Sequence, residues 1–371
     1  MATFGTIALG AACLVAWETI LHDRSLTNDE INSGDGRVSS SSPLPTETMV
    51  AASLTSGNSL TRKIEDTSLA NIRDVSPLNL TDGISRGKMD VPVFWVIPKA
   101  GTSTIKSVMA KCLDLAMASS NPKVVENPEA VQNLEVMDIA AGRFINVDLA
   151  VPSGIAHAQK LGLVGSGLSD VAMSSYIHEM AGLFEHPDAP KGKMFAVFRH
   201  PVERMVSDFY YMQKATWERS QPDDPAALAQ SLEEYATDPS KHVDNWMTRL
   251  LADRRFSAEC AKQGCPLTEE DYQFARSVLT RKCLVLLLDK IDESLRRLLK
   301  YTGWSERLKN SACLDTFAHK APSNKNDHNY LESGTELYEK LREINRYDIL
   351  LYWHARELFE NQGRLFDSAV G

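Results

Sequence analysis

Two stretches of the sequence, about a hundred residues apart, follow the same plan. Each begins with an apolar run that does not alternate with polar residues, Val93–Ile97 in one and Met194–Phe198 in the other, as in strands buried on both faces. Each run is followed by a short turn and then by apolar residues at helical spacing. The repeated strand–turn–helix plan predicts an α/β fold with parallel strands, and a third strand is expected at 284–288.

The first turn, Lys99–Thr104, reads Lys-Ala-Gly-Thr-Ser-Thr. Its glycine lets the backbone approach a ligand closely, and its three hydroxyl residues stand where the first N–H groups of a helix lack partners. The turn can therefore hold an anion before the helix expected from Ile105 onward. In the simpler alternative, the hydroxyls only cap that helix and Lys99 points to solvent. The phosphate loop of nucleotide kinases is not matched, because it needs a second glycine and places its lysine after it.

The second turn is Arg199–His200–Pro201. Proline suits the first turn of a helix, where its missing N–H costs nothing. Arg199 leaves the carboxyl end of the predicted strand, and Ser207 lies two turns into the helix. Ligands of open α/β sheets collect at that edge of the sheet, so these two side chains are candidates for binding.

Together the two units resemble the sulfotransferases that use 3′-phosphoadenosine 5′-phosphosulfate (PAPS). "PKAGTST" is similar to that family's 5′-phosphosulfate loop. "FRHPVERMVSDFYY" is similar to its 3′-phosphate motif, in which an arginine and a serine eight residues later bind the phosphate. The resemblance implies a three-layer, P-loop-like sulfotransferase fold with a central parallel sheet, PAPS as cofactor, and no metal. It implies cofactor contacts from Lys99, Ala100, Gly101, Thr102, Ser103 and Thr104 at the 5′ end, and from Arg199 and Ser207 at the 3′-phosphate.

The resemblance extends from about Val91 to Phe359. "KCLVLLLDKIDESLRRLLKYTGW" and "NRYDILLYWHARELF" resemble the late strand and helix and the closing helix of Golgi-type carbohydrate sulfotransferases. The late R-x-G-x-x-G-D-W-K motif of the cytosolic enzymes is absent. The resemblance thus implies transfer of a sulfuryl group to a hydroxyl of a carbohydrate or glycoprotein acceptor. Two alternatives stay open: another nucleotide-dependent, kinase-like transferase, and a catalytically inactive binding protein of the same fold.

Sulfuryl transfer is an in-line displacement, so its catalysis consists of positioning, neutralising the leaving phosphate and removing the acceptor's proton. Lys99 would neutralise the phosphate. The family draws its base from the segment between the two motifs, which here offers Asp148, His157, His178 and Glu179. We favour His178, with Glu179 as its orienting partner or a rival base. A surface or capping role is the alternative for any single histidine.

The N-terminal part has a different composition. Residues 1–21 carry no charge before Glu18 and are expected to be a signal anchor or a cleaved signal peptide. Residues 22–90 are rich in Ser and Thr, contain a glycosylation sequon at Asn79, and are expected to be a largely disordered stem or linker. This leaves residues 91–365 for the sulfotransferase domain. The expected location is the secretory pathway, as a single-pass type II Golgi membrane protein or, alternatively, as a secreted one.

Net charge and cysteine content restrict the binding partners and the disulfides that can be expected. The formal net charge of −9 argues against a general nucleic-acid binder, and no metal-binding cluster is visible. The six cysteines are too few and too scattered for a disulfide scaffold, so most are expected in the core. Cys260 and Cys265 are the exception, since they could close a short loop in an oxidising lumen.

Ser333 and Glu336 have the spacing of a capping box before the last helices.

Overall fold

The structure is a computed structural model. It describes residues 90–121, 124, 127–185, 190–214, 231–239, 241–254, 265–320 and 331–367. The chain divides into two units, of which His22–Ala70 lies outside the described residues and the other contains every element below. The expected targeting segment, the sequon at Asn79 and the stem, apart from Asp90, also lie outside. In the described part, no helix is both long and apolar enough to cross a membrane.

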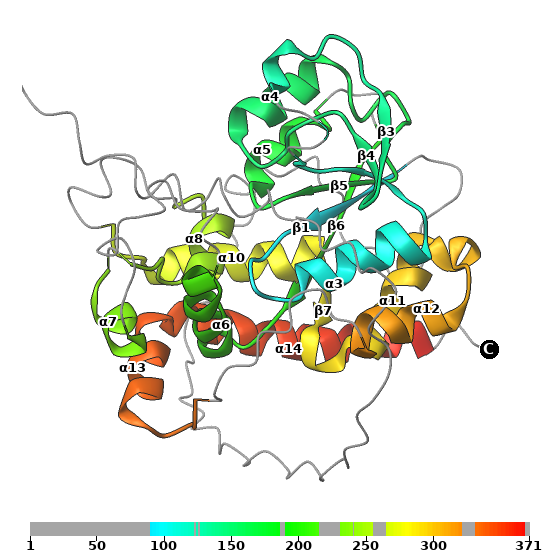
Figure 1. Cartoon of the computed structure of the whole chain (residues 1–371). Coiled ribbons are helices and arrows are strands. Elements are labelled where there is room, and N and C mark those ends of the chain that lie inside the picture. Colours follow the sequence, from blue (N-terminus) through cyan, green and yellow to red (C-terminus); the bar gives the residue numbers. More distant parts are fainter. Residues whose placement is uncertain are drawn as a thin grey trace, which may run out of the picture. The chain divides into compact units, whose positions relative to one another are not determined.

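The centre of the fold is a sheet of seven strands in the order β3-β4-β2-β5-β1-β6-β7 (Figure 1). All neighbouring strands are parallel except β3 and β4, which form an antiparallel pair at one edge. The strands are β1 (Val91–Trp95), β2 (Ala116–Ala118), β3 (Val136–Ile139), β4 (Gly142–Ile145), β5 (Val171–Ser174), β6 (Gly192–Phe198) and β7 (Cys283–Leu287).

The helices and short helical turns of the described residues connect and cover these strands. They are α3 (Thr102–Ser107), η3 (Val108–Cys112), η4 (Pro128–Ala130), α4 (Pro152–Lys160), α5 (Ile177–Gly182), α6 (Pro201–Lys214), α7 (Leu232–Thr237), α8 (Trp246–Leu251), α10 (Glu269–Lys282), η7 (Leu288–Lys290), α11 (Ile291–Thr302), η8 (Trp304–Arg307), α12 (Ser311–Asp315), η9 (Thr316–Lys320), α13 (Glu336–Ile344) and α14 (Arg346–Asp367).

Successive strand residues point to opposite faces, and both faces are covered. On one face, Phe94, Phe195 and Leu286 join a core cluster with residues of α3, η3 and α11. On the other, Trp95 stacks on Trp246 of α8, with ring centroids 6.2 Å apart. The molecule is therefore a three-layer α/β structure in its described part.

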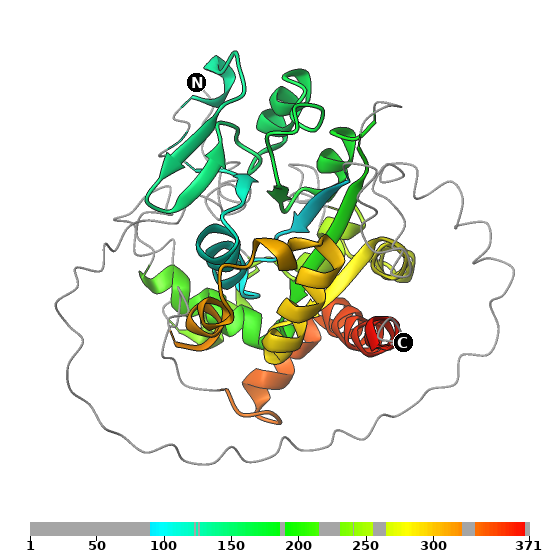
Figure 2. The same cartoon turned by 90° about the vertical axis from the view of Figure 1, so that its right-hand side faces the viewer.

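The edge strand β7 is covered by α14, which runs beside it (Figure 2). The Gln362 side chain of α14 accepts a hydrogen bond from the Val285 N–H and donates one to the Cys283 carbonyl, at 3.0 and 2.9 Å. Backbone groups that an edge strand leaves unpaired are thus satisfied by a side chain, and the edge is closed to further strands.

The three expected strands are confirmed as β1, β6 and β7: β1 is shifted by two residues and β7 by one, while β6 begins two residues earlier than expected and ends where expected. They are neighbours, with Phe94 level with Phe195 and Phe195 level with Leu284. The first helix begins at Thr102, three residues before the expected start, and continues as the π-helical turn η3. The predicted capping box at Ser333 is wrong, because the helix begins at Glu336 and Thr335 is its N-cap, accepting a bond from the Tyr338 N–H.

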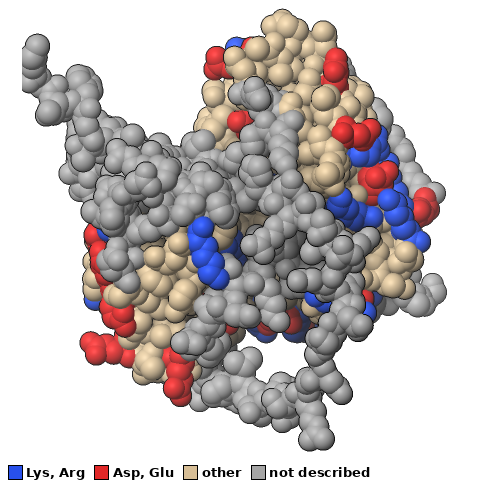
Figure 3. Space-filling model, viewed as in Figure 1, with Lys and Arg blue, Asp and Glu red and all other residues tan. Residues whose placement is uncertain are grey.

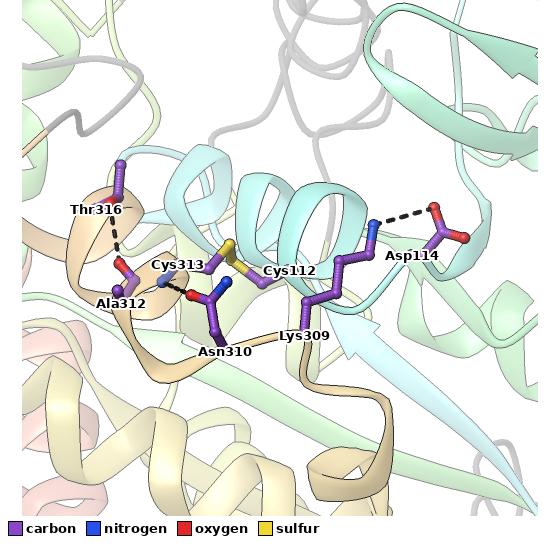
Figure 4. Close-up of a disulfide and its surroundings, with 7 residues drawn as sticks. All are labelled: Cys112, Asp114, Lys309, Asn310, Ala312, Cys313 and Thr316. Atoms are coloured by element: carbon purple, nitrogen blue, oxygen red, sulfur yellow. Dashed lines mark hydrogen bonds and ion pairs between the residues drawn. A yellow bond between two sulfur atoms is a disulfide. The ribbon is translucent and has the colours of Figure 1, made fainter.

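Cys112 is buried in the core, as expected, and Cys313 is partly buried against it, but the sequence did not predict that the two would pair. They form a disulfide between the end of η3 and α12, although 201 residues separate them in the sequence (Figure 4). Cys283 is a free, buried cysteine, as expected, and burial raises the pKa of its thiol. Cys265 is also disulfide-bonded, while its expected partner Cys260 lies outside the described residues.

Helices α8 and α14 begin next to each other and cap one another. Asp348 of α14 accepts bonds from the backbone N–H groups of Met247 and Thr248, at 3.0 and 2.8 Å. In return, the Asn245 side chain before α8 accepts bonds from the N–H groups of Tyr347 and Asp348. Both carboxylate and amide are buried, so this exchange fixes α8 over the end of β1.

Candidate functional site

The two turns singled out in the sequence lie side by side at the carboxyl edge of the sheet. They follow β1 and β6, which are adjacent and parallel (Figure 1). Arg199 Nη1 donates a hydrogen bond to the Lys99 carbonyl at 3.3 Å, and Arg199 Nε donates to Glu203 Oε2 at 3.3 Å. The prediction that the two turns lie side by side is confirmed.

The backbone of the first turn is constrained by its left-handed conformation and by its close packing. Lys99 and Gly101 both have left-handed backbone angles, with φ of 61° and 95°. A Cβ at Gly101 would lie 2.7 Å from Leu288 Cδ1, so the turn is closely packed as well as left-handed. The Thr102 hydroxyl donates to the Ile97 carbonyl at 3.0 Å and the Gly101 carbonyl accepts from the Ile105 N–H. The Thr102 hydroxyl is thus used within the turn itself.

The Lys99 side chain extends from the first turn to the helix of the second. Its Nζ lies 3.5 Å from the centre of the Tyr211 ring, a cation–π contact. Tyr211 is on α6, one helical turn after Ser207, which is buried. Lys99, Arg199, Ser207 and Tyr211 therefore gather where the β1 turn meets α6.

An acidic group that the sequence analysis did not select lies in the same place. Asp208 follows Ser207 on α6, and its Oδ2 accepts a hydrogen bond from the Tyr235 hydroxyl at 2.7 Å. Burial raises the pKa of the Asp208 carboxyl, against the opposing effects of the Tyr235 hydrogen bond and the charges of Arg204, Lys99 and His242. The sequence could have pointed to Asp208 only through its position next to Ser207. Nothing in the sequence indicated that Tyr235, on a different helix, would be its partner.

His242, which follows α7, belongs to this group as well. Its Nδ1 lies 2.6 Å from the Tyr235 carbonyl, which can only accept, so Nδ1 carries the proton and Nε2 is the acceptor of the neutral ring. Burial lowers the pKa of His242, which favours that neutral form despite the nearby carboxylates of Asp244, Asp208 and Asp238.

His178, the favoured base, follows the carboxyl end of β5, the strand on the other side of β1. The Ser175 hydroxyl donates to the Val96 carbonyl at 2.9 Å, which joins the ends of these two strands. His178 Nε2 donates to the Leu251 carbonyl at 2.8 Å, leaving Nδ1 as the acceptor nitrogen. That Nδ1 is buried and meets no hydrogen-bond partner within the described structure.

The other base candidates have different surroundings. His157 lies on α4, in the connection between β4 and β5, and its Nε2 donates to the Val131 carbonyl at 2.8 Å. Asp148 Oδ1 accepts from the Ala150 N–H, and the Asp148 backbone packs against Gly154 of α4. Glu179 is half-buried beside His178. Only His178 and Glu179, of these four, follow the carboxyl end of a strand next to β1.

A shallow groove of about 550 Å³ lies elsewhere, beside the β3–β4 pair. Figure 3 shows Lys and Arg interspersed with Asp and Glu on that side of the molecule. Arg143 pairs with Asp138 at 3.4 Å, Lys309 with Asp114 at 3.9 Å, and Lys111 donates to the Ala140 carbonyl. This groove contains no residue of either turn, so it is not the candidate site. Over the described residues, no group of His, Cys, Asp and Glu is arranged to hold a metal ion.

Comparison with known proteins adds no relative: no family model matches the chain, and no curated protein matches it.

Proposed function

We propose that the chain is a sulfotransferase that moves the sulfuryl group of PAPS to a hydroxyl of a carbohydrate acceptor. The observation that carries the proposal is the hydrogen bond from Arg199 to the Lys99 carbonyl, because it joins the two motifs that resemble the family's phosphate-binding elements. Motifs that were about a hundred residues apart in the sequence meet at the edge where α/β sheets bind ligands.

In this proposal the two turns hold opposite ends of the nucleotide. Arg199 and Ser207 would bind the 3′-phosphate, since a guanidinium offers a planar pair of donors to a phosphate. The closely packed turn around Gly101 and the ammonium of Lys99 would bind the 5′-phosphosulfate. The Lys99 side chain extends to α6, where it contacts Tyr211, one helical turn after Ser207.

The chemistry requires two further actions. As the sulfur–oxygen bond to the phosphate breaks, negative charge grows on the bridging oxygen, and the Lys99 ammonium would stabilise it. The acceptor hydroxyl must lose its proton as it attacks, and His178 Nδ1 would take it, with Glu179 as orienting partner or rival base. Because Nε2 of His178 is held by the Leu251 carbonyl, the ring presents one defined acceptor nitrogen.

The acceptor and the location are inferred from other observations. The choice of a carbohydrate or glycoprotein follows from the resemblance to Golgi-type enzymes. The Cys112–Cys313 disulfide supports the secretory pathway, because such bonds persist in oxidising compartments. We propose a type II Golgi membrane protein anchored by residues 1–21, or a secreted one if that segment is cleaved.

The test begins with thermal denaturation of the full chain in the presence of 3′-phosphoadenosine 5′-phosphate (PAP) or ATP. PAP is expected to raise the melting temperature in a concentration-dependent way, and ATP is expected to have little effect. Stabilisation by ATP alone would favour a kinase-like transferase. The second measurement is transfer of labelled sulfate from PAPS to a panel of glycans, in which binding without transfer would indicate an inactive relative.

A further inference from the structure

The His178 ring contacts two helices that are far from it in the sequence. Its Nε2 donates a hydrogen bond to the Leu251 carbonyl at the end of α8, at 2.8 Å. Its ring also stacks on that of Phe274 of α10, with ring centroids 6.3 Å apart and planes 20° from parallel. The first contact fixes one edge of the imidazole and the second lies against its face, so together they restrict the position and the rotation of the ring.

The two helices that contact this ring are joined to each other. Arg249 of α8 donates from Nη1 to the Cys265 carbonyl just before α10, at 2.9 Å. Arg254, three residues after the end of α8, donates from Nε to Asp271 in the first turn of α10, at 2.8 Å. Phe274 lies one helical turn after Asp271, so it is carried by a helix whose start is anchored to α8.

The second ring nitrogen of His178 is available for a ligand. Nδ1 is buried and receives no hydrogen bond in the part of the chain that the structure describes. Because Nε2 carries the proton that the Leu251 carbonyl accepts, Nδ1 is an acceptor. A buried acceptor without a donor is costly, and the hydroxyl of a bound acceptor molecule would supply the missing donor.

Resting on the proposed function, we propose that Phe274 is a positioning residue for His178. Its ring holds the imidazole in the plane in which Nε2 meets the Leu251 carbonyl and Nδ1 is left to take the proton of the attacking hydroxyl. Without the Phe274 ring, the imidazole turns more freely, and its bond to the carbonyl is made only part of the time. Nδ1 then spends less time in the position from which it can accept the proton.

Tyr272 provides a matched control on the same helix. Both Tyr272 and Phe274 are half-buried aromatic residues of α10. The Tyr272 ring stacks instead on Tyr347 of α14, with ring centroids 6.0 Å apart. Replacing either residue with leucine removes a ring from α10, but only Phe274→Leu removes the ring that lies against His178. A role in packing alone would affect the two variants alike.

The first measurement does not depend on the proposed function. In proton–nitrogen NMR spectra of the full chain labelled at histidine, an imidazole N–H that is held by a carbonyl exchanges slowly with water and gives a signal. The signal of His178 is identified by its absence in His178→Ala. Wild type, Tyr272→Leu and Phe274→Tyr are expected to show this Nε2–H signal, and Phe274→Leu is expected to lose it.

The second measurement is transfer of labelled sulfate from PAPS. Phe274→Leu is expected to lower turnover about tenfold, since small displacements of a reacting group are costly, while PAP affinity stays near that of wild type. Phe274→Tyr should restore most of the turnover, and Tyr272→Leu should retain it. In a His178→Ala background, Phe274→Leu should cause no further loss, because its effect passes through the imidazole.

The two proposals fail separately. If wild type neither binds PAP nor transfers sulfate, the proposed function is wrong and the positioning role falls with it. If wild type transfers sulfate but Phe274→Leu keeps both the N–H signal and the turnover, the positioning role is wrong and the sulfotransferase proposal stands.

Two further results would overturn the positioning role alone. One is the absence of the Nε2–H signal in wild type, and the other is an equal loss of turnover from Phe274→Leu with and without His178. Should Phe274→Leu fail to fold, Phe274→Met is the second variant, because it keeps an apolar side chain of similar length without the ring. It is expected to lose the same signal and turnover, and retention of both would again contradict the inference.

Discussion

Arg199 joins the two turns of the site through its guanidinium. One nitrogen donates to the Lys99 carbonyl and another to the Glu203 carboxylate, and the side chain is about one-fifth exposed. The arginine is thus held in place before any ligand arrives. Glu203 is its present anionic partner, and a bound 3′-phosphate would compete with that carboxylate for the same group.

Replacing Arg199 with alanine should weaken PAP binding at least tenfold, because a charge-assisted bond to phosphate contributes about 1.5–3 kcal/mol. Arg199→Lys should restore only part of the affinity, since an ammonium lacks the planar pair of donors. Calorimetric titration with PAP measures both. Unchanged affinity in Arg199→Ala would show that this turn does not hold the nucleotide.

His178→Ala should lower turnover by about 10²–10⁴-fold, the usual effect of removing a positioned acid–base group. PAP affinity should stay near that of wild type, because the phosphates bind elsewhere. Labelled-sulfate transfer gives the rate and calorimetry the affinity. Glu179→Gln should have a smaller effect. If instead Glu179→Gln or His157→Ala abolishes turnover while His178→Ala does not, that residue is the base.

The turn between β1 and α3 depends on a glycine in a left-handed conformation. Gly101→Ala places a methyl group 2.7 Å from Leu288 Cδ1 at a φ of 95°. Gly162 is a matched control, since it has a φ of 72° and open space around its missing Cβ. Gly162→Ala should cost about 1–2 kcal/mol of unfolding free energy from conformation alone.

Gly101→Ala should cost more than this control, because the Leu288 side chain must also move, and it alone should weaken PAP binding. Urea denaturation and PAP titration of both variants provide the comparison. Equal losses of stability, with PAP binding intact in both, would contradict a ligand-binding role for the turn.

The elements that the sequence predicted best are those with a local signal. Strands buried on both faces appear as unbroken apolar runs, and this is why β1, β6 and β7 were found within two residues. The start of α3 was placed three residues late because Thr102, Ser103 and Thr104 carry no apolar periodicity, although all three are helical.

Features made by distant residues could not be found in this way. Asp208 and Tyr235 meet only because α6 and α7 pack together, and Asn245 and Asp348 exchange caps across 103 residues. The cysteine spacing gave no indication that Cys112 pairs with Cys313, because the two helices that carry them meet only in the folded chain. For the site, the sequence predicted the two turns and their meeting, while the hydrogen bond between Tyr235 and Asp208 required the structure.

At the scale of the whole molecule, a long-range disulfide between Cys112 and Cys313 links η3 to α12 in the described part of the chain (Figure 4). In the chain-entropy account, closing a loop of 201 residues stabilises the native state by about 5 kcal/mol. Cys313→Ala, or reduction of the bond, should therefore lower the unfolding free energy by about 2–5 kcal/mol in urea denaturation. Cys283→Ala is the control for a buried cysteine that makes no such link. An equal loss in both variants would show that packing, not the crosslink, is responsible.

The same bond determines how much of the chain is stretched when the protein is pulled at its ends. If the chain is unfolded and pulled between Asp90 and Asp367, tension passes along the backbone to Cys112, crosses the disulfide to Cys313 and continues to the C-terminal end. The segment between the two cysteines, which are 201 positions apart, then stays outside the stretched chain while the bond is intact. Reduction would add that segment to the stretched chain, lengthening it by roughly 700 Å. A protein pulled at its ends in an oxidising medium would therefore extend far less than its length of chain allows.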